Sequence, residues 1–331
     1  MIEKRFSSFI LQMKRNMDPN TSKADLDYNA KAKVRGLASR CHKRLLQQAG
    51  LNRLSESVRA ELASLAKSGG RLLGPATLDE VDILAARLHD ESPWMNNVTT
   101  FVMHHMRTHV RNGGVGLHLP PIILAGPPGI GKSWFARSIA SAAGLPSRLI
   151  DVGAGGAAFR IAGTEKGWGS AQPGLPVEVM LQMRIGNPVM IVDEIDKTET
   201  AFGTKGSGSN LATALLPFLD HGTAQRFECP FTRVPFDMTR VIWVLTANDI
   251  DRISAPLRDR CLVFNLPGIT PATAALFFDY LVREIDNIEE LKAEASAFVA
   301  KMAGQPAGIS LRQIRRLAKT LGHTETVEVL Q

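Results

Sequence analysis

The chain contains few cysteines and no long apolar stretch, and each shortage excludes a class of protein. Only three cysteines occur among its 331 residues, at positions 41, 229 and 261, and none forms a CxxC pair. The sequence therefore indicates neither a disulfide framework nor a cysteine-based zinc site, and a reducing, cytoplasmic setting fits. No segment reaches the ~18 apolar residues of a membrane span, and the first residues lack the apolar core of a secretory signal. We therefore expect no membrane partner.

Negative charge is scarce in the first 75 residues. This region holds 15 Lys and Arg against 6 Asp and Glu, whereas the whole chain carries a formal net charge of +7, so the remainder is slightly acidic. A local positive excess can attract nucleic acid or an acidic protein surface. It also fits a solvated helical face, which we favour because neither a known DNA-binding motif nor interleaved aromatic residues accompany it.

The hydrophobic pattern divides the chain into three parts. Apolar residues recur at helical spacing in the first part and just after it, at residues 30–67, 78–89 and 97–110. Short apolar runs then alternate with helical patterns, as in a parallel sheet covered by helices on both faces; the predicted strands are residues 122–125, 148–152, 189–192, 241–246 and 262–265. Only helical patterns follow, at residues 271–284, 289–302 and 310–321. We expect a basic helical region at residues 1–75, an α/β domain at 76–267 and a helical unit at 268–331.

A glycine-rich loop follows the first predicted strand. Residues 126–133 read Gly-Pro-Pro-Gly-Ile-Gly-Lys-Ser, which is typical of a phosphate-binding loop between a buried strand and a helix. Its glycines let backbone N–H groups surround the β-phosphate, Lys132 would reach the β- and γ-phosphates, and the Ser133 hydroxyl would ligate Mg²⁺. The sequence therefore predicts binding of a nucleoside triphosphate by Gly126, Pro127, Pro128, Gly129, Ile130, Gly131, Lys132 and Ser133.

Two carboxylates follow the third predicted strand. The apolar run at residues 189–192 ends in Asp193 and Glu194, about sixty residues after the phosphate-binding loop. In this position Asp193 would hold Mg²⁺ beside Ser133, and Glu194 would act as the general base that activates water. This pairing of loop and acidic strand end predicts hydrolysis of the bound triphosphate.

Polar and basic residues follow the fourth predicted strand. The strand ends in Thr-Ala-Asn at residues 246–248, and Asn248 is our candidate to hydrogen-bond the γ-phosphate or the attacking water. Arg258 and Arg260 come ten and twelve residues after Asn248, just before the last strand. They lie too far along the fold to reach their own nucleotide easily, so we expect them to supply positive charge to a neighbour's site.

These stretches together resemble the AAA+ ATPases, and within them the ATPase module of the Lon proteases. The resemblance covers about residues 76–321 and is most specific at residues 126–133, 187–197, 234–237, 246–248 and 256–260. It implies a P-loop NTPase (AAA+) fold: a parallel sheet with flanking helices and an all-α C-terminal lid. The hydrophobic pattern adds an α-helical N-terminal region. It also implies a ring, usually a hexamer, that hydrolyses ATP with Mg²⁺ at subunit interfaces. By this resemblance Arg260 matches the arginine finger, whereas Arg258 stands where Lon-like modules usually carry an apolar residue.

A glycine-rich loop later in the chain carries a tryptophan. Residues 163–174 look like the Lon segment that projects an aromatic residue into the central pore, and Trp168 falls on that aromatic position. A bulky aromatic on a mobile loop can grip an extended polypeptide without reading its sequence; a Trp packed as local core is the alternative. The Gly/Ser loop at residues 203–209 would be a second pore loop.

The last helical pattern resembles the stretch where AAA+ lids place a second sensor arginine. The Lon family has Gly-x-Arg where this chain reads Gly308-Ile309-Ser310. Arg312 is therefore the first candidate for this arginine and Arg315 the second. A solvated helix face is the alternative interpretation of both.

The resemblance does not extend to proteolysis. Lon proteases continue into a domain with a catalytic Ser and Lys, which this sequence does not contain, so we expect an ATPase without protease activity. The predicted function is a Lon-like motor that remodels or unfolds a protein client through the pore of a homo-oligomeric ring. Two alternatives stay open: a nucleic-acid motor or loader that uses the basic N-terminal region, and a switch whose ATP-dependent assembly is the signal.

Overall fold

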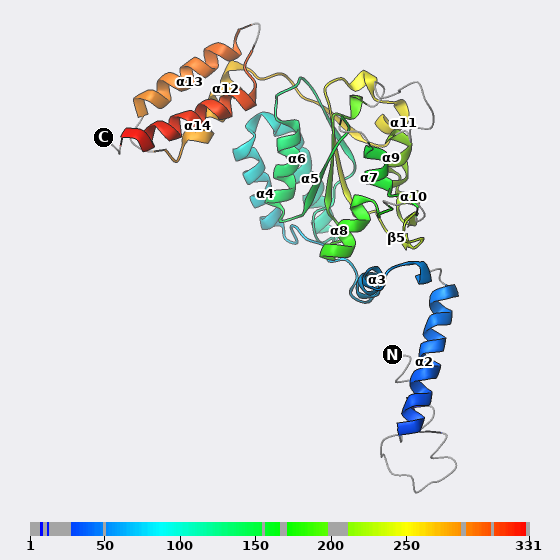
Figure 1. Cartoon of the computed structure of the whole chain (residues 1–331). Coiled ribbons are helices and arrows are strands. Elements are labelled where there is room, and N and C mark those ends of the chain that lie inside the picture. Colours follow the sequence, from blue (N-terminus) through cyan, green and yellow to red (C-terminus); the bar gives the residue numbers. More distant parts are fainter. Residues whose placement is uncertain are drawn as a thin grey trace. The chain divides into compact units, whose positions relative to one another are not determined.

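The structure is a computed structural model in which the chain divides into two compact units, Met1–Ser64 and Leu65–Gln331. It describes residues 7–8, 12, 28–48, 51–153, 156–165, 171–197, 211–285, 289–305 and 308–328. Figure 1 shows the elements of each unit coloured along the sequence. None of the helices within these ranges is both long and apolar enough to cross a membrane.

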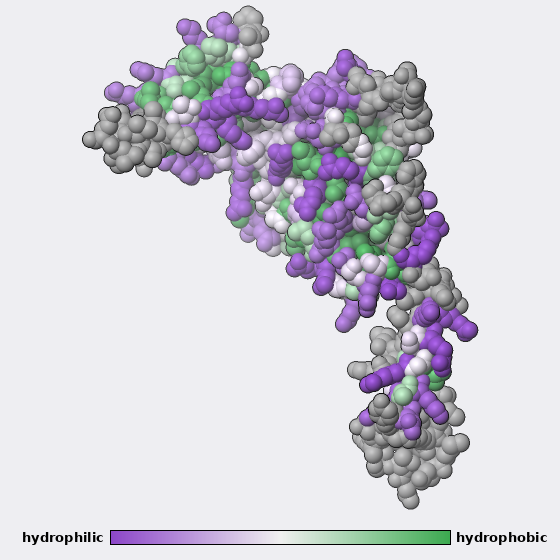
Figure 2. All heavy atoms as spheres, viewed as in Figure 1, coloured by the Kyte–Doolittle hydropathy of each residue, from purple (hydrophilic) through white to green (hydrophobic). Residues whose placement is uncertain are grey.

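The first unit is helical. Helix α2 (Tyr28–Gln48) is followed by the 3₁₀ turn η1 (Leu51–Arg53) and by α3 (Glu56–Ser68), which continues into the second unit. Val34 and Leu54 are buried. Helix α2 contains six Lys and Arg but no Asp or Glu, and hydrophilic side chains extend along it (Figure 2).

A five-stranded parallel sheet forms the centre of the second unit. Its order is β2-β3-β6-β1-β7, with the strands β1 (Ile122–Ala125), β2 (Ser147–Asp151), β3 (Val189–Asp193), β6 (Ile242–Ala247) and β7 (Leu262–Asn265). Each strand begins and ends within one residue of its prediction. The apolar residues of β1, β3 and β6 are buried, as in strands covered on both faces. Because the strands are parallel, the residues that follow them gather at one edge of the sheet.

Helices cover both faces of this sheet (Figure 1). On one face α4 (Leu78–Glu91), α5 (Asn96–Arg111) and α6 (Lys132–Ala142) share an apolar core with alternate strand residues, among them Ile122 and Leu124. On the other face the ring of Trp243 lies 5.3 Å from that of Phe218 in α9. The remaining helices of this layer and its ends are α7 (Ala157–Ala162), α8 (Leu175–Met183), α9 (Leu211–Leu219), α10 (His221–Ala224) and α11 (Ala255–Arg258).

Some short elements escape the sequence pattern. The two-residue strands β4 (Phe227–Glu228) and β5 (Pro235–Phe236) form an antiparallel hairpin beside the main sheet. Each is too short to show the alternation by which strands are recognised. The 3₁₀ turns η2 (Pro93–Met95) and η4 (Ile250–Arg252) are equally short.

Three helices form the C-terminal part of the second unit: α12 (Pro271–Val282), α13 (Glu289–Ala303) and α14 (Leu311–Glu328). They enclose a small apolar core of their own. Helix α14 extends seven residues beyond the end that the sequence predicts. Trp94 packs against both this core and the core beneath the sheet, and its indole N–H donates to the Ile130 carbonyl at 3.0 Å. The tryptophan therefore connects the helical part directly to the phosphate-binding loop.

Candidate functional site

The loop between β1 and α6 depends on glycines at two positions. Gly129 and Gly131 have φ values of +83° and +92°, in the left-handed region that favours glycine. A Cβ atom at position 129 would lie 2.9 Å from the Cβ of Ser310, and one at position 131 would lie 2.9 Å from Leu311 Cδ1. Leu311 also donates its backbone N–H to the Gly129 carbonyl at 3.1 Å. The glycines thus permit both the turn of the loop and the close approach of the C-terminal helices.

Lys132 is held at the start of α6, pointing back toward the loop. Its side chain is almost fully buried, at 7% exposure, and Nζ donates to the carbonyls of Gly126 at 2.7 Å and Pro127 at 2.8 Å and to Asn248 Oδ1 at 2.9 Å. Burial lowers the pKa of Lys132, and nearby carboxylates, led by Asp196, oppose this effect. The structure therefore brings together the loop lysine and the asparagine predicted to contact the γ-phosphate or the water.

Ser133 and Asp193 meet where the sequence predicts a metal site. The Ser133 hydroxyl donates to Asp193 Oδ1 at 2.6 Å, although sixty positions separate the two residues. A hydroxyl and a carboxylate at this distance are oxygen donors of the kind Mg²⁺ prefers, and Mg²⁺ in nucleotide sites commonly takes one or two protein ligands with substrate phosphates. The residues present therefore fit the predicted Mg²⁺.

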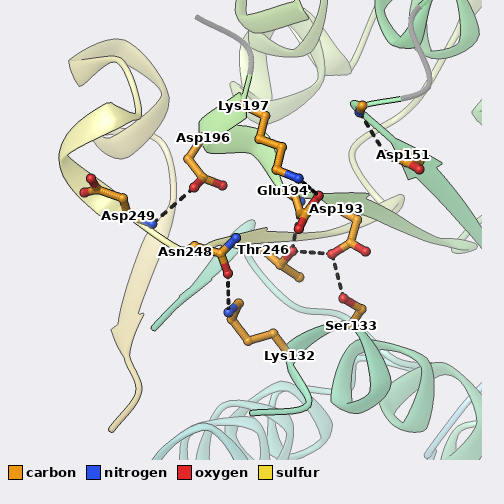
Figure 3. A network of polar contacts seen from close by, with 11 residues as sticks. Lys132, Ser133, Asp151, Asp193, Glu194, Asp196, Lys197, Thr246, Asn248 and Asp249 are labelled. Carbon is orange, nitrogen blue, oxygen red and sulfur yellow. Dashed lines mark hydrogen bonds and ion pairs between the residues drawn. The ribbon is translucent and has the colours of Figure 1, made fainter. Parts of the chain in front are cut away.

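Thr246 is a site residue that the sequence reasoning missed. It lies at the end of β6 with no exposed surface; its hydroxyl donates to Asp193 Oδ1 at 2.5 Å and accepts the Glu194 backbone N–H at 3.1 Å. One side chain thus fixes both acidic residues, as Figure 3 shows. The available signal was a hydroxyl near the end of an otherwise apolar run, two residues before Asn248.

Glu194 turns sharply out of β3. Its φ is +57°, which is uncommon for a residue with a side chain. Its carboxylate forms an ion pair with Lys197 at 2.6 Å. Two residues further on from Glu194, Asp196 accepts the backbone N–H of Asp249 at 3.3 Å, which ties the segment after β3 to the segment after β6.

These groups line a pocket of about 280 Å³ that also includes side chains of the C-terminal helices. Both candidates for the second sensor, Arg312 and Arg315, line it. The guanidinium of Arg315 lies 3.9 Å from the ring centre of Trp134, within the range of a cation–π contact. The full lining is Pro128, Gly129, Gly131, Lys132, Ser133, Trp134, Arg137, Asp193, Glu194, Thr246, Asn248, Phe277, Leu311, Arg312 and Arg315.

Ser310, which stands where Lon-like modules carry arginine, forms hydrogen bonds within its own turn. Its backbone N–H donates to Gln313 Oε1 at 2.8 Å, and its hydroxyl accepts the Gln313 backbone N–H at 3.3 Å. This reciprocal pattern is a capping box at the start of α14. An arginine that reaches the pocket must therefore come from farther along α14, where Arg312 and Arg315 lie.

Arg258 is the last residue of α11 and Arg260 lies two residues beyond it; neither is among the described residues that line the pocket. Arg260 is exposed and donates to the Pro256 carbonyl at 3.0 Å. Arg258 is half-buried and lies 3.7 Å from Asp251 Oδ1. Trp168 and the loop at residues 203–209 lie outside the described residues, so both stay predictions.

Comparison with known proteins places this site in a family. Residues 122–266 match the ATPase family associated with various cellular activities (AAA). The chain is 33% identical over 259 residues to Lon protease 4 of Sorangium cellulosum, a match that covers 76% of this chain and 31% of the relative. It is 29% identical over 250 residues to Lon protease homolog 2, peroxisomal, of Caenorhabditis elegans, again covering 31% of the relative. The chain thus spans less than a third of the length of these relatives.

Solved structures support the fold. The structure of a Saccharomyces cerevisiae Hsp104:casein complex in an extended conformation has a TM-score of 0.55 and 17% identity, covering 75% of this chain and 47% of that one. A closed state of Hsp104 with ATPγS and casein has a TM-score of 0.58 and 16% identity, covering 92% and 53%. At this identity the likeness concerns the fold alone. Together with the family match and the phosphate-binding site, these findings show that the chain belongs to the AAA+ ATPases and resembles the ATPase module of the Lon proteases.

Proposed function

We propose that the chain is an ATP-hydrolysing motor that remodels or unfolds a protein client. The supporting observation is the 2.6 Å contact between Ser133 and Asp193, which share one pocket with the buried Lys132 and with Glu194. A structural loop would need neither a buried lysine nor a hydroxyl beside a carboxylate. Nucleotide binding followed by hydrolysis gives each of these groups a task.

The proposed chemistry assigns a step to each side chain. Lys132 leaves the loop carbonyls and neutralises the β- and γ-phosphates, while Ser133 and Asp193 would hold Mg²⁺, which adds positive charge there when bound. Glu194 accepts the proton of the attacking water, and Asn248 orients that water. Thr246 holds the backbone of Glu194 and the carboxylate of Asp193 in fixed positions through its two hydrogen bonds.

The proposal also includes the assembly of several copies of the chain. We infer a homo-oligomeric ring, a hexamer by its resemblance to Lon-like modules, in which Arg260 of one subunit contacts the ATP bound by the next. Arg258 is the second candidate for this role. Arg312, with Arg315 as its alternative, would report the state of the γ-phosphate to the C-terminal helices, and Trp168 would grip the client in the pore. A cytoplasmic location stays a prediction.

The variant Glu194→Gln tests this proposal. It should bind ATP with nearly unchanged affinity but lose turnover by about 10²-fold or more, because the general base is removed while the phosphate contacts remain. ATP affinity by calorimetry and phosphate release measure the two effects, and the exposed Glu228→Gln is the matched control. With ATP, the variant should stay assembled and retain its client. Undiminished turnover would show that the base is elsewhere.

Helix α2 favours nucleic acid as a second candidate partner. All six of its basic side chains are exposed, and no acidic residue of the helix offsets them. Lys33, Arg40 and Arg44 follow one another at spacings of seven and four, so they share one face of the helix. A continuous row of cations along a helix is a surface to which nucleic-acid phosphates bind.

Reversal of this charge would decide between the two candidates. If nucleic acid binds here, changing Lys33, Arg40 and Arg44 to Glu should abolish salt-sensitive binding of duplex DNA or single-stranded RNA, measured by fluorescence anisotropy at several salt concentrations. Equal charge reversal at the exposed Arg87, Arg111 and Lys301 is the control. Binding that is absent in the wild type, or lost equally in both variants, would reject this candidate.

A further inference from the structure

The carboxylate of Glu194 has a cationic partner close by in sequence. Lys197 Nζ lies 2.6 Å from Glu194 Oε2, and the two side chains are 50% and 38% exposed. The backbone N–H of Lys197 also donates to the Glu194 carbonyl at 3.0 Å. Residues 195–197 lie in a 3₁₀ turn that begins directly after Glu194, and such a turn takes about three residues. The turn therefore brings the lysine to the carboxylate.

The main chain of Glu194 is fixed independently of this ion pair. Its N–H donates to the buried Thr246 hydroxyl at 3.1 Å, so the start of the side chain has a set position. Three rotatable bonds nevertheless separate the backbone of Glu194 from its carboxylate. Among the described residues, Lys197 is the partner that holds the far end (Figure 3).

Lys197 keeps its charge in this position. The hydrogen bond to Glu194 and the charge of that residue raise the pKa of Lys197, with smaller contributions from Asp196 and Asp151 and with burial opposing. The ammonium is thus a permanent cation against one oxygen of the carboxylate. The second oxygen, Oε1, has no partner in the part of the chain that the structure describes, and Glu194 lines the nucleotide pocket.

We propose that Lys197 is a positioning residue for hydrolysis: by binding Glu194 Oε2 it orients the carboxylate so that Oε1 accepts the proton of the attacking water. This inference rests on the proposed role of Glu194 as general base. Lys197 itself is not among the described residues that line the nucleotide pocket. A surface ion pair of this exposure contributes at most about 1 kcal/mol to stability, so its effect should appear in catalysis and hardly in folding.

Steady-state kinetics of Lys197→Met and Lys197→Arg test the proposal. The methionine keeps the apolar stem and removes the cation, so kcat should fall by about tenfold, less than the 10²–10⁴-fold that general-base catalysis contributes. KM for ATP should change less than about twofold, because binding contacts are untouched. Arginine, which can also bind the carboxylate, should restore most of kcat. Lys292→Met is the matched control, since Lys292 forms an i,i+3 pair with Glu289 at 2.7 Å in α13.

A double variant separates this inference from the proposed function. If Lys197 acts through Glu194, then Lys197→Met should lower kcat no further when Glu194→Gln is already present. An unchanged or increased kcat in Lys197→Met alone, or a loss that arginine does not restore, would overturn the positioning role. If Glu194→Gln instead retains full turnover, the assignment of the base fails first, whatever Lys197 does.

Discussion

At the scale of single residues, the site is built from side chains that each satisfy two neighbours. Thr246 bonds to both Asp193 and Glu194, and Lys132 bonds to the loop and to Asn248. In the structure these groups complete one another's hydrogen bonds, so ATP and Mg²⁺ would exchange existing partners for new ones. Such a network holds the reacting groups in place before substrate arrives.

A stack of imidazoles beside the sheet gives a prediction at this scale. The ring of His118 lies 5.0 Å from that of His109 and 5.9 Å from that of His105. Burial, followed by the charge of Arg240, lowers the pKa of His118 to about 4. The folded protein therefore takes up this proton only near pH 4, whereas the unfolded chain takes it up near pH 6.5.

Between pH 6.5 and pH 4 the unfolded chain binds this proton and the folded protein does not. The free energy of unfolding should therefore fall as the pH falls from 6.5 to 4 and level off below pH 4. Because the ring of His118 is only half-buried, solvent screens part of the effect, and we expect the free energy of unfolding to fall by about 1–2 kcal/mol. This loss is smaller than the full shift of the pKa would give. Urea denaturation at several pH values would measure it. His118→Gln should remove this part of the pH dependence, and the exposed His104→Gln should retain it. An identical pH dependence in His118→Gln would contradict the account.

The sequence alone predicts the candidate site residues that belong to short motifs. The loop lysine and serine, Asp193, Glu194 and Asn248 all follow predicted strands, and parallel strands bring their ends together. The same reasoning missed Thr246, because a threonine in a strand is ordinary by composition and its role depends on two bonds across strands. It also ranked Arg312 before Arg315, and the structure does not separate the two, since both line the pocket.

At the scale of elements, Asn187 fastens the start of β3 to two distant segments. Its side chain has no exposed surface; it accepts the Leu73 N–H at 3.0 Å and donates to the carbonyls of Leu73 at 2.8 Å and Leu117 at 2.9 Å. The amide thus supplies to the segments at residues 73 and 117 the hydrogen bonds that a neighbouring strand would otherwise supply.

Asn187→Leu should therefore destabilise the second unit by about 3 kcal/mol, because it removes the partner of the Leu73 N–H and of the Leu117 carbonyl, each loss costing about 1–3 kcal/mol before relaxation. Thermal unfolding followed by circular dichroism would measure the loss. The exposed Asn112→Leu provides the control. If both variants unfold at the wild-type temperature, the segments at residues 73 and 117 do not depend on this side chain.

The fold itself was largely predictable at this scale. Strands β1, β3, β6 and β7 are mainly apolar runs, so their lengths can be read from the sequence, whereas β2 contains only two apolar residues. The β4–β5 hairpin could not be predicted because two residues show no periodicity. The extra length of α14 could not be predicted because its last turns are polar, and polar residues continue or end a helix equally well.

At the scale of the whole molecule, we propose that the ATP site is formed by one subunit together with its neighbour. The nucleotide pocket contains the loop, both carboxylates and the C-terminal arginines, but neither Arg258 nor Arg260 is among the described residues that line it. Arg260 is exposed and lies two residues before the start of β7, whereas the pocket lies at the ends of β1, β3 and β6. We propose that a finger at this position completes the site of another subunit.

Mixing two inactive variants tests this shared site most directly. Glu194→Gln keeps the finger and lacks the base, whereas Arg260→Ala keeps the base and lacks the finger, and each alone should hydrolyse ATP at least about 10²-fold more slowly. In an equimolar mixture about a quarter of randomly formed interfaces pair an intact base with an intact finger. The account predicts that phosphate release returns to about that fraction of wild type. No recovery in rings shown to contain both variants, or full activity of Arg260→Ala alone, would contradict it.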